Sequence, residues 1–232
     1  MHKNQKKIIL NLGCGVGVFY KAPYKTWGYN AYYINVDKYI DEEDIRKGAG
    51  ENKGVMGAAI WEDGAEYVKA DILKLPFPDN YADGIELQQV IEHFSWWQTV
   101  PAIKEIYRVM KPKAKLILSA PNFNALAKDW VENCWYEEYL AKNGTIDIDA
   151  FINRNEEIFG NQRGLPESNG EIHKCAINPR FIQYLFSVAG FKKLNISCYA
   201  KGSDYPDNLG TISRPHKGTV LRNENVIALA WK

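Results

Sequence analysis

A glycine-rich turn near the start of the chain is the first feature that predicts chemistry. A mostly apolar run at residues 9–12 leads directly into Gly13, Cys14, Gly15 and, after one intervening residue, Gly17. Glycines at the end of a buried strand permit a tight turn and let the backbone approach a ligand closely. A tight strand-to-helix connection without a ligand would use the same residues, so the turn needs a second signal.

Asp37 supplies that second signal. It follows an apolar stretch that ends in Asn35 and Val36, at about the distance from the glycine turn at which nucleotide-binding proteins place an acid. A carboxylate there can accept hydrogen bonds from both hydroxyls of a ribose. A solvated aspartate at the start of a loop is the alternative interpretation. Together with the glycine turn, Asp37 favours a ribose-containing ligand.

Two ligand classes contain such a ribose: nicotinamide dinucleotides and adenosyl groups. The dinucleotide fingerprint is G-x-G-x-x-G, with a helix N-terminus facing the pyrophosphate. Here the glycines run G-x-G-x-G. S-adenosylmethionine has no phosphate and does not require the dinucleotide spacing, so the local pattern favours the methyl donor.

The elements that must position these residues alternate between short apolar runs and helical segments. Such alternation predicts βαβ units and a parallel sheet. Strands are expected at Ile8–Leu12, Tyr32–Val36, Tyr67–Lys69, Gly84–Leu87, Lys115–Ser119, Leu194–Tyr199 and Val226–Trp231, the last two as an antiparallel pair. Apolar residues from Val100 to Met110 recur at helical spacing, and Pro112 is expected to stop that helix. A second helix is expected between Asn178-Pro179, as N-cap and N1, and Gly190.

Two segments fall outside this pattern. Residues from about 40 to 66 are rich in Gly, Asp and Glu and predict an irregular insertion around one helix. Residues from about 122 to 177 contain Trp130, Trp135 and Tyr136, and we expect this segment to be a cap or lid over the ligand. The role of the long loop at about 201–222 is open.

Composition sets the broad class of protein. The 232 residues are 46% hydrophobic and 25% charged, with a formal net charge of +1, which favours one globular domain and gives no global attraction to nucleic acid or membranes. No apolar stretch is long enough to span a membrane or to serve as a secretory signal. The four cysteines (Cys14, Cys134, Cys175 and Cys198) form no C-x-x-C pair, so we expect a reduced, cytoplasmic protein.

Three further stretches resemble one enzyme family. They are V-K-A-D-I-L-K-L-P-F-P-D-N at 68–80, L-Q-Q-V-I-E-H-F at 87–94 and Y-R-V-M-K-P at 107–112. This ordered set resembles class I S-adenosylmethionine-dependent methyltransferases, in the branch that reads "D-I-x-x-L-P-F-x-D-N" and then "V-L-E-H". The resemblance covers about residues 8–122 and, weakly, 178–191. It implies a single domain over 1–232, an α/β Rossmann-like doubly wound sheet of seven strands with an antiparallel last strand, and a cap insertion at about 122–177.

The resemblance also implies roles for individual residues. Gly13, Cys14, Gly15 and Gly17 would contact the methionine part of S-adenosylmethionine, and Asp37 would bind the ribose. Asp71 would accept a hydrogen bond from the adenine amino group with Ile72 beside the ring, and Gln88 would lie near the methionyl group. Asp71 as a turn cap and Gln88 as a surface amide are the structural alternatives. The chain departs from the family at Gln89, often His, and at Lys113-Ala114, usually Gly-Gly.

The acceptor side of the reaction is less defined in the sequence. A neutral histidine within reach would help to deprotonate a hydroxyl acceptor, and the candidates are His93 and His173. Glu92-His93 matches the "E-H" pair of the family, which can be structural or catalytic. His173, Cys175 and Cys134 match no common zinc spacing, and we expect no metal.

The sequence therefore predicts a methyltransferase that acts on an O or N atom of a small molecule or glycan. A non-catalytic S-adenosylmethionine-binding protein of the same fold is the alternative from another class, and a nicotinamide oxidoreductase is a third. We expect no membrane or nucleic-acid partner. The acceptor and the oligomeric state are not encoded in any motif we recognise.

Overall fold

A computed structural model describes residues 6–15, 17–20, 27, 30–51, 60–132, 158–160, 172–199 and 225–232. Its strands are β1 (Lys7–Leu12), β2 (Gly17–Val18), β3 (Ala31–Asp37), β4 (Ile60–Trp61), β5 (Glu66–Lys69), β6 (Ala82–Gln88), β7 (Met110–Pro121), β8 (Lys193–Tyr199) and β9 (Asn225–Trp231). Its helices are α1 (Glu42–Glu51), α2 (Trp96–Val109), α3 (Phe123–Glu132) and α6 (Pro179–Ala189), with 3₁₀ turns η1 (Ile72–Lys74) and η2 (Ile91–His93).

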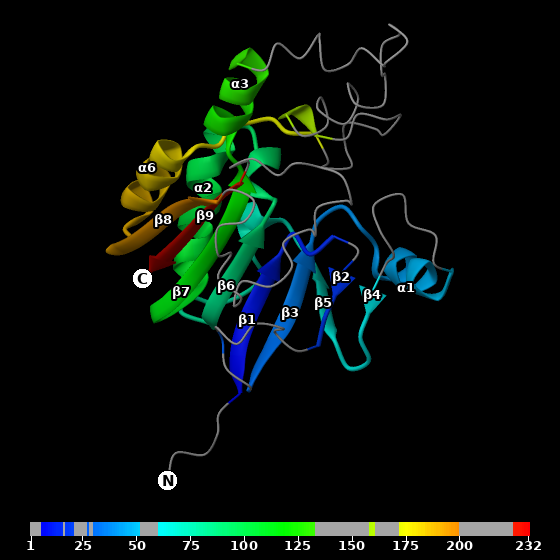
Figure 1. Ribbon diagram of the computed structural model, residues 1–232. Helices are drawn as coiled ribbons and strands as arrows, with labels where there is room; N and C mark the ends of the chain where they lie inside the picture. Colours follow the sequence, from blue (N-terminus) through cyan, green and yellow to red (C-terminus); the bar gives the residue numbers. More distant parts are fainter. Residues whose placement is uncertain are drawn as a thin grey trace, which may run out of the picture.

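The central sheet has seven strands in the order β5-β3-β1-β6-β7-β9-β8. The first five are parallel, and β9 pairs antiparallel with both β7 and β8. Figure 1 shows α2 and α6 against one face of this sheet. The predicted seven-stranded α/β architecture with an antiparallel last strand is confirmed.

Alternation along the strands divides the core between the two faces of the sheet. Leu10 and Leu12 of β1 belong to the large cluster that also contains the buried residues of α2 and α6. Ile9, which precedes Leu10 in the chain, belongs to a smaller cluster on the other face with Trp27 and Tyr33. This period of two is what a strand buried on both faces requires.

Helix α6 has the ends that the sequence predicted. The Asn178 side-chain oxygen accepts a hydrogen bond from the Phe181 amide at 3.0 Å, and Pro179 occupies the first turn. Gly190 ends the helix at φ +100°, a left-handed conformation that glycine adopts without a Cβ penalty.

Helix α2 ends earlier than the sequence predicted. It stops at Val109, and β7 already begins at Met110, before Pro112. The amides of Asn80 and Tyr81 donate to the carbonyls of Arg108 and Val109 at 3.0 and 2.7 Å, so the loop before β6 replaces the next helical turn as partner of these carbonyls.

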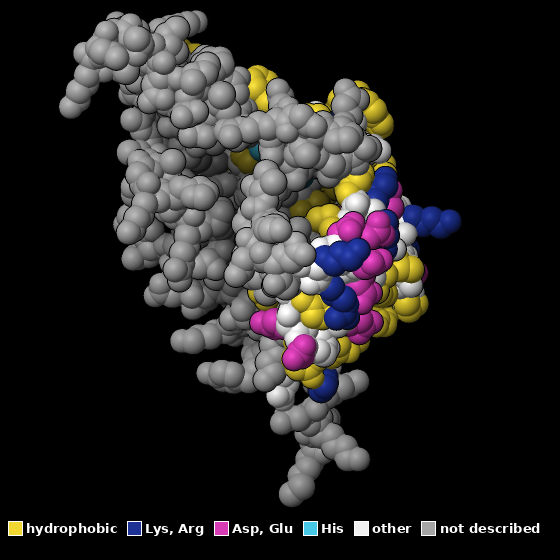
Figure 2. All heavy atoms as spheres, turned by 90° about the vertical axis from the view of Figure 1, so that its right-hand side faces the viewer, with side chains coloured by type: hydrophobic (Ala, Val, Ile, Leu, Met, Phe, Trp, Pro, Cys, Tyr) yellow, Lys and Arg dark blue, Asp and Glu magenta, His cyan; other side chains and the backbone are white. Residues whose placement is uncertain are grey.

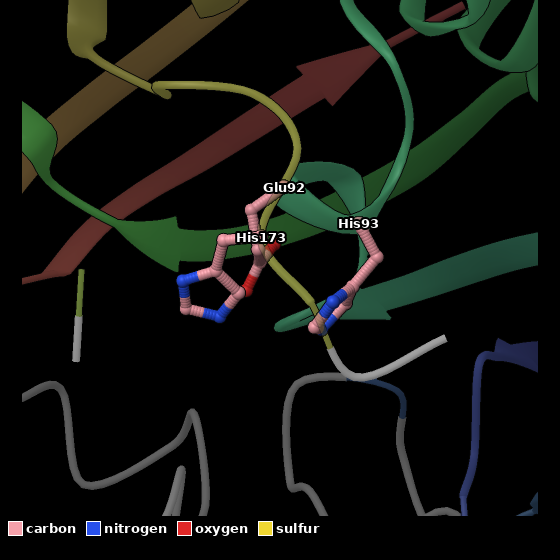
Figure 3. Close-up of side chains that lie close together, drawn as sticks. All are labelled: Glu92, His93 and His173. Atoms are coloured by element: carbon pink, nitrogen blue, oxygen red, sulfur yellow. The ribbon is translucent and has the colours of Figure 1, made fainter. Parts of the chain in front are cut away.

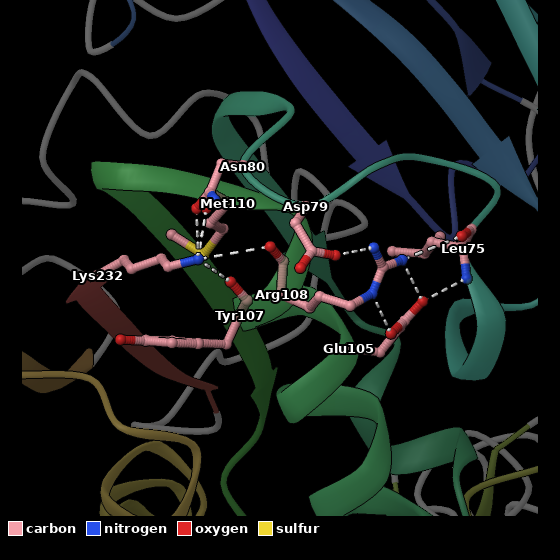
Figure 4. A network of polar contacts seen from close by, with 8 residues as sticks. All are labelled: Leu75, Asp79, Asn80, Glu105, Tyr107, Arg108, Met110 and Lys232. Carbon is pink, nitrogen blue, oxygen red and sulfur yellow. Dashed lines mark hydrogen bonds and ion pairs between the residues drawn. The ribbon is translucent and has the colours of Figure 1, made fainter.

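The last residue of the chain reinforces this helix end (Figure 4). The Lys232 ammonium donates to the carbonyls of Tyr107 and Met110 at 2.9 and 2.8 Å. Beside it, the Arg108 guanidinium contacts Asp79 and Glu105, each at 2.7 Å. A cation at a helix C-terminus is favourable because the helix dipole is negative there.

The segment at 40–66 contains one helix, α1, as expected, and also a feature that was not predicted. Strand β4 pairs parallel with β2 in a separate two-stranded sheet. Basic and acidic side chains are interleaved over the described atoms of this side of the molecule (Figure 2). Arg46 pairs with Glu42, and Lys47 with Glu43, at 2.9 and 2.8 Å. Among the described residues of this face, charges of both signs therefore alternate without an extended patch of one sign.

The predicted cap lies mostly outside the described residues. Within it the structure describes α3, residues 158–160 and residues 172–177. Trp135, Tyr136, the side chain of Trp130 and the loop at 201–222 fall outside, so the lid and the single-domain extent stay predictions. In the described ranges, every helix is too short or too polar to cross a bilayer.

Candidate active site at the carboxyl edge of the sheet

The direction in which the chain adds strands to the sheet reverses between β1 and β6. From β1 the chain proceeds outward to β3 and β5, whereas β6 starts on the other side of β1 and leads to β7. In open α/β sheets, ligands bind beyond the carboxyl ends of the strands at such a switch point. Gly13 follows β1 there, Asp37 ends β3 and Gln88 ends β6.

The glycine turn is tied to the end of β3. The amides of Gly13 and Cys14 both donate to the Val36 carbonyl, at 2.7 and 3.1 Å. The amide of Gly15 donates to Oδ2 of Asp37 at 3.0 Å. The structure thus brings together the two features that carried the sequence prediction, and Asp37 helps to fix the turn itself.

Two glycines in this turn have left-handed backbone conformations, but the space around them differs. Gly13 has φ +69° and packs against Val90, so a Cβ there would overlap the valine side chain. Gly15 has φ +57°, and a Cβ there would meet nothing within 4 Å. The Val90 side chain therefore leaves no space for a ligand at the Cβ position of Gly13. Gly15 has free space in which a ligand can approach the backbone, which fits the methionine end of S-adenosylmethionine.

Asp37 retains acceptor capacity beyond its contacts with the protein. Oδ1 accepts from the Tyr39 amide at 2.9 Å, and Oδ2 from Gly15. An ionised carboxylate has about four acceptor positions. These two bonds orient the group and leave positions for the hydroxyls of a ribose, so the geometry fits the expected role.

Asp71 follows β5 and caps the turn η1. Its Oδ1 accepts from the Leu73 amide at 2.9 Å, and its Oδ2 forms an ion pair with Lys38 at 2.7 Å. The predicted turn-cap alternative is therefore observed, and it does not exhaust the acceptor positions of the carboxylate. Ile72 is 7% exposed and packs in the main core. Lys38 was not predicted from the sequence.

Gln88 connects the end of β6 to a buried acid. Its amide nitrogen donates to Glu86 at 2.9 Å, and Glu86, 1% exposed, also accepts from the Trp27 indole. Burial raises the pKa of Glu86 despite these donors. Burial, together with the charge of Asp37, also raises the pKa of Cys14, which keeps that thiol protonated beside the turn.

Glu92, His93 and His173 come together directly after β6 (Figure 3). One ligand atom from each lies within 4.8 Å of the others. The contact depends on backbone bonds: the Glu92 carbonyl accepts from the amides of Lys174 and Cys175 at 2.7 and 3.1 Å. Both predicted histidines therefore belong to one cluster, and Glu92 joins them.

Burial dominates the electrostatics of this cluster. It raises the pKa of Glu92 to about 8, with only the carboxylate's own backbone amide acting in the other direction. Burial also lowers the pKa of His93, although hydrogen bonds to the carbonyls of Ile172 and Gln89 act to raise it. Burial and the nearby His93 lower the pKa of His173 to about 4. Burial therefore favours the neutral form of both imidazoles.

A cavity of about 170 Å³ opens beside the cluster. Its lining includes Glu92, Pro121, Phe123, Leu126, His173 and Ile177. Apolar side chains make up most of this wall, with the carboxylate and imidazole as polar groups. Such a mixture is typical of small-molecule sites.

Comparison with known proteins identifies the domain. Residues 10–118 match the family model described as a methyltransferase domain. An uncharacterized protein of Methanocaldococcus jannaschii is 30% identical over 126 residues, 54% of this chain and 46% of that protein. A ubiquinone/menaquinone biosynthesis C-methyltransferase of Erwinia tasmaniensis is 34% identical over 80 residues, 33% of this chain and 29% of that protein. The chain spans about half the length, or less, of the curated relatives it matches.

A solved structure shows the same fold over the whole chain. A SAM-dependent methyltransferase from Methanosarcina mazei aligns with a TM-score of 0.55 at 19% identity, covering 98% of this chain and 93% of that one. At this identity the likeness concerns the fold, and the family match of residues 10–118 concerns the sequence. Family membership implies S-adenosylmethionine as the cofactor. Residues 10–118 are therefore a methyltransferase domain by sequence, and the described fold is the Rossmann-like fold of S-adenosylmethionine-dependent methyltransferases.

Proposed function

We propose that this chain transfers a methyl group from S-adenosylmethionine to a small-molecule acceptor. The observation that carries the proposal is the open Gly15 backbone held on Asp37 at the switch point of the sheet. Gly13, Cys14 and Gly17 complete the turn, Asp71 and Ile72 contact the adenine, and Gln88 lies toward the methionyl group. Bound S-adenosylmethionine supplies a methyl group already activated by its sulfonium.

The acceptor is proposed to bind on the side of Glu92, His93 and His173. Val90, which packs on Gly13, is only two residues from Glu92, so the cluster adjoins the cofactor turn. A metabolite suits the cavity of about 170 Å³, and the similarity to a C-methyltransferase of quinone biosynthesis supports a small molecule more than a glycan. That similarity covers only 33% of the chain and fixes neither the substrate nor the acceptor atom.

We propose an oxygen or nitrogen acceptor because the imidazole of His173 lines the cavity and the ring of His93 lies 5.0 Å from it, centroid to centroid, and burial favours the neutral form of both. His93 and His173 can promote the transfer in two ways. One of them can take the proton from the acceptor as the new bond to carbon forms, or both can hold a metal ion that lowers the acceptor's pKa. Alignment of acceptor and donor supplies much of the remaining rate, up to about 7–11 kcal/mol in favourable cases.

Calorimetric titration with S-adenosylmethionine and S-adenosylhomocysteine tests the cofactor site, with Asp37→Ala as the disabled variant. Lys47→Ala is the control, because Lys47 pairs with Glu43 on the surface of α1. We expect micromolar binding by the wild type and the control, and loss of binding in Asp37→Ala. Release of S-adenosylhomocysteine in the presence of phenols, catechols and amines then tests turnover. Tight binding without turnover across that panel would favour a cofactor-binding accessory protein instead.

A further inference from the structure

We propose that Glu92, His93 and His173 form a binding site for a divalent first-row transition-metal ion. The three residues offer two imidazole nitrogens and one carboxylate oxygen, all within 4.8 Å of one another. Two histidines and one carboxylate are a donor set that proteins use for zinc and for non-haem iron. The sequence predicted no metal because the spacing of His173, Cys175 and Cys134 matches no common zinc site.

The distances require only side-chain adjustment. With metal–ligand bonds of about 2.1 Å, ligand atoms lie about 3.0–3.4 Å apart in octahedral or tetrahedral geometry. The ligand atoms lie within 4.8 Å of one another, so small rotations about the side-chain torsions would bring them to these distances. The backbone is already in place, since Glu92 and His93 share the turn η2 and the Glu92 carbonyl holds the amides after His173.

The two imidazoles are oriented as metal ligands. Nδ1 of His93 lies 3.2 Å from the Ile172 carbonyl, and Nδ1 of His173 lies 3.1 Å from the Ile158 carbonyl. A carbonyl accepts only, so in the neutral ring each Nδ1 carries the proton and each Nε2 keeps its lone pair. A backbone carbonyl on the other ring nitrogen is the usual outer partner of a metal-binding histidine.

The Glu92 carboxylate supplies an independent observation. Glu92 is 2% exposed, and both side-chain oxygens are buried without a hydrogen bond from any other residue in the described ranges. Burying a polar group without a partner is costly, and an ionised carboxylate costs most. A divalent cation between the oxygens and the two lone pairs would satisfy all three groups together.

The donor set also predicts which ion binds. Imidazole nitrogen suits zinc, cobalt, nickel, iron and manganese, whereas magnesium and calcium prefer sites made only of oxygen. Three protein donors leave coordination positions for water or another oxygen ligand, and the adjoining cavity includes Glu92 and His173 in its wall. If the proposed function holds, the acceptor oxygen takes such a position, and the imidazoles hold the ion instead of taking the proton.

Metal binding is tested without reference to methyl transfer. Tag-free protein is stripped with chelator and titrated with Co²⁺, whose visible absorption reports nitrogen and oxygen ligation, and with Zn²⁺ by calorimetry. We expect one ion per chain, a zinc-dependent rise in Tm, and no comparable binding of Mg²⁺. Glu92→Gln, His93→Gln and His173→Gln should each weaken binding at least 100-fold.

The matched control is Cys175→Ala. Cys175 borders the same cavity and is a potential zinc ligand, but it is not part of the cluster. The proposal predicts unchanged affinity in this variant. Loss of binding in Cys175→Ala, with retention in Glu92→Gln, would overturn the assignment, as would the absence of binding in the wild type. A folded Glu92→Gln protein is expected without metal, because glutamine has nearly the shape of the glutamate side chain and introduces no charge into the buried site; its unfolding transition in chelator checks this.

Failure of this proposal and failure of the proposed function give different results. Protein that binds S-adenosylmethionine but no Zn²⁺ or Co²⁺ contradicts only the metal site. Protein that binds one metal ion through Glu92 and both histidines but no S-adenosylmethionine contradicts only the proposed function.

Discussion

Replacing Gly13 by alanine should destabilise the fold chiefly through Val90. The new Cβ would overlap Cγ2 of Val90 and stand 3.0 Å from its Cγ1, inside the usual carbon–carbon contact of about 3.5–4.0 Å. Overlap in a packed site costs about 1–3 kcal/mol, and the left-handed conformation costs alanine about 1–2 kcal/mol more. Alanine also lowers the conformational entropy of the unfolded chain, which offsets about 0.4–1 kcal/mol of the lost stability. The free energy of unfolding should therefore fall by about 2–4 kcal/mol.

Gly15→Ala is the matched comparison, since Gly15 has a similar φ but no atom within 4 Å of the new Cβ. Its loss should be about 1 kcal/mol, from the left-handed conformation alone. The order should reverse for cofactor affinity, because the methyl group occupies the space in which the ligand approaches. Urea denaturation measures the first quantity and calorimetry with S-adenosylhomocysteine the second.

A double-mutant cycle isolates the contact itself. Val90→Ala should recover part of the stability lost in Gly13→Ala and none of that lost in Gly15→Ala. Equal destabilisation by the two glycine substitutions would refute the packing argument. Normal cofactor affinity in Gly15→Ala would refute the assignment of the open space to the ligand.

Three further predictions concern neighbouring parts of the fold. Asp71→Asn keeps an oxygen for the Leu73 amide but loses its charge, so S-adenosylmethionine should bind about 10-fold more weakly by calorimetry at nearly unchanged Tm. Lys113→Gly should stabilise the protein by about 0.5–1 kcal/mol in urea denaturation, because Lys113 has φ +68°; a loss of stability would contradict this. Hydrogen bonds from Arg108 lower the pKa of Glu105, so their stabilisation is present above the ordinary carboxyl pKa of about 4.3 and is lost as pH falls through the lower folded value. The stability difference between wild type and Glu105→Gln should therefore be largest near neutral pH and vanish in acid, and a pH-independent difference would contradict the pairing.

The parallel sheet was predictable because each strand carries its own signal. Apolar runs such as Ile8–Leu12 and Tyr32–Val36 coincide with β1 and β3 to within one or two residues. The pair β2 and β4 could not be predicted, because two-residue strands have no periodicity to detect. The early end of α2 also escaped prediction, since the amides that replace its next turn belong to a loop nearly thirty residues earlier.

The two halves of the candidate site differ in the same way. Gly13 and Gly15 follow β1 and Asp37 ends the adjacent strand β3, and a short-range pattern of glycines and one acid was enough to place them together. The cluster of Glu92 with His173 joins residues far apart in the chain through two backbone hydrogen bonds. Neither residue belongs to a spacing that signals a ligand set, so the sequence identified the histidines singly and missed their contact.

The turn η2 gives a physical reason why the two halves should act together. Val90 packs on the glycine that shapes the cofactor turn, and Glu92 and His93 follow it at once in the buried cluster. A change in side-chain volume at Val90 should therefore displace both the backbone of the glycine turn at Gly13 and the side chains of Glu92 and His93. Because both contacts arise from one short 3₁₀ turn, displacement of that turn should alter cofactor affinity and metal affinity in the same variant. Substitutions at exposed positions of α6, such as Tyr184 and Val188, should alter neither except through global stability.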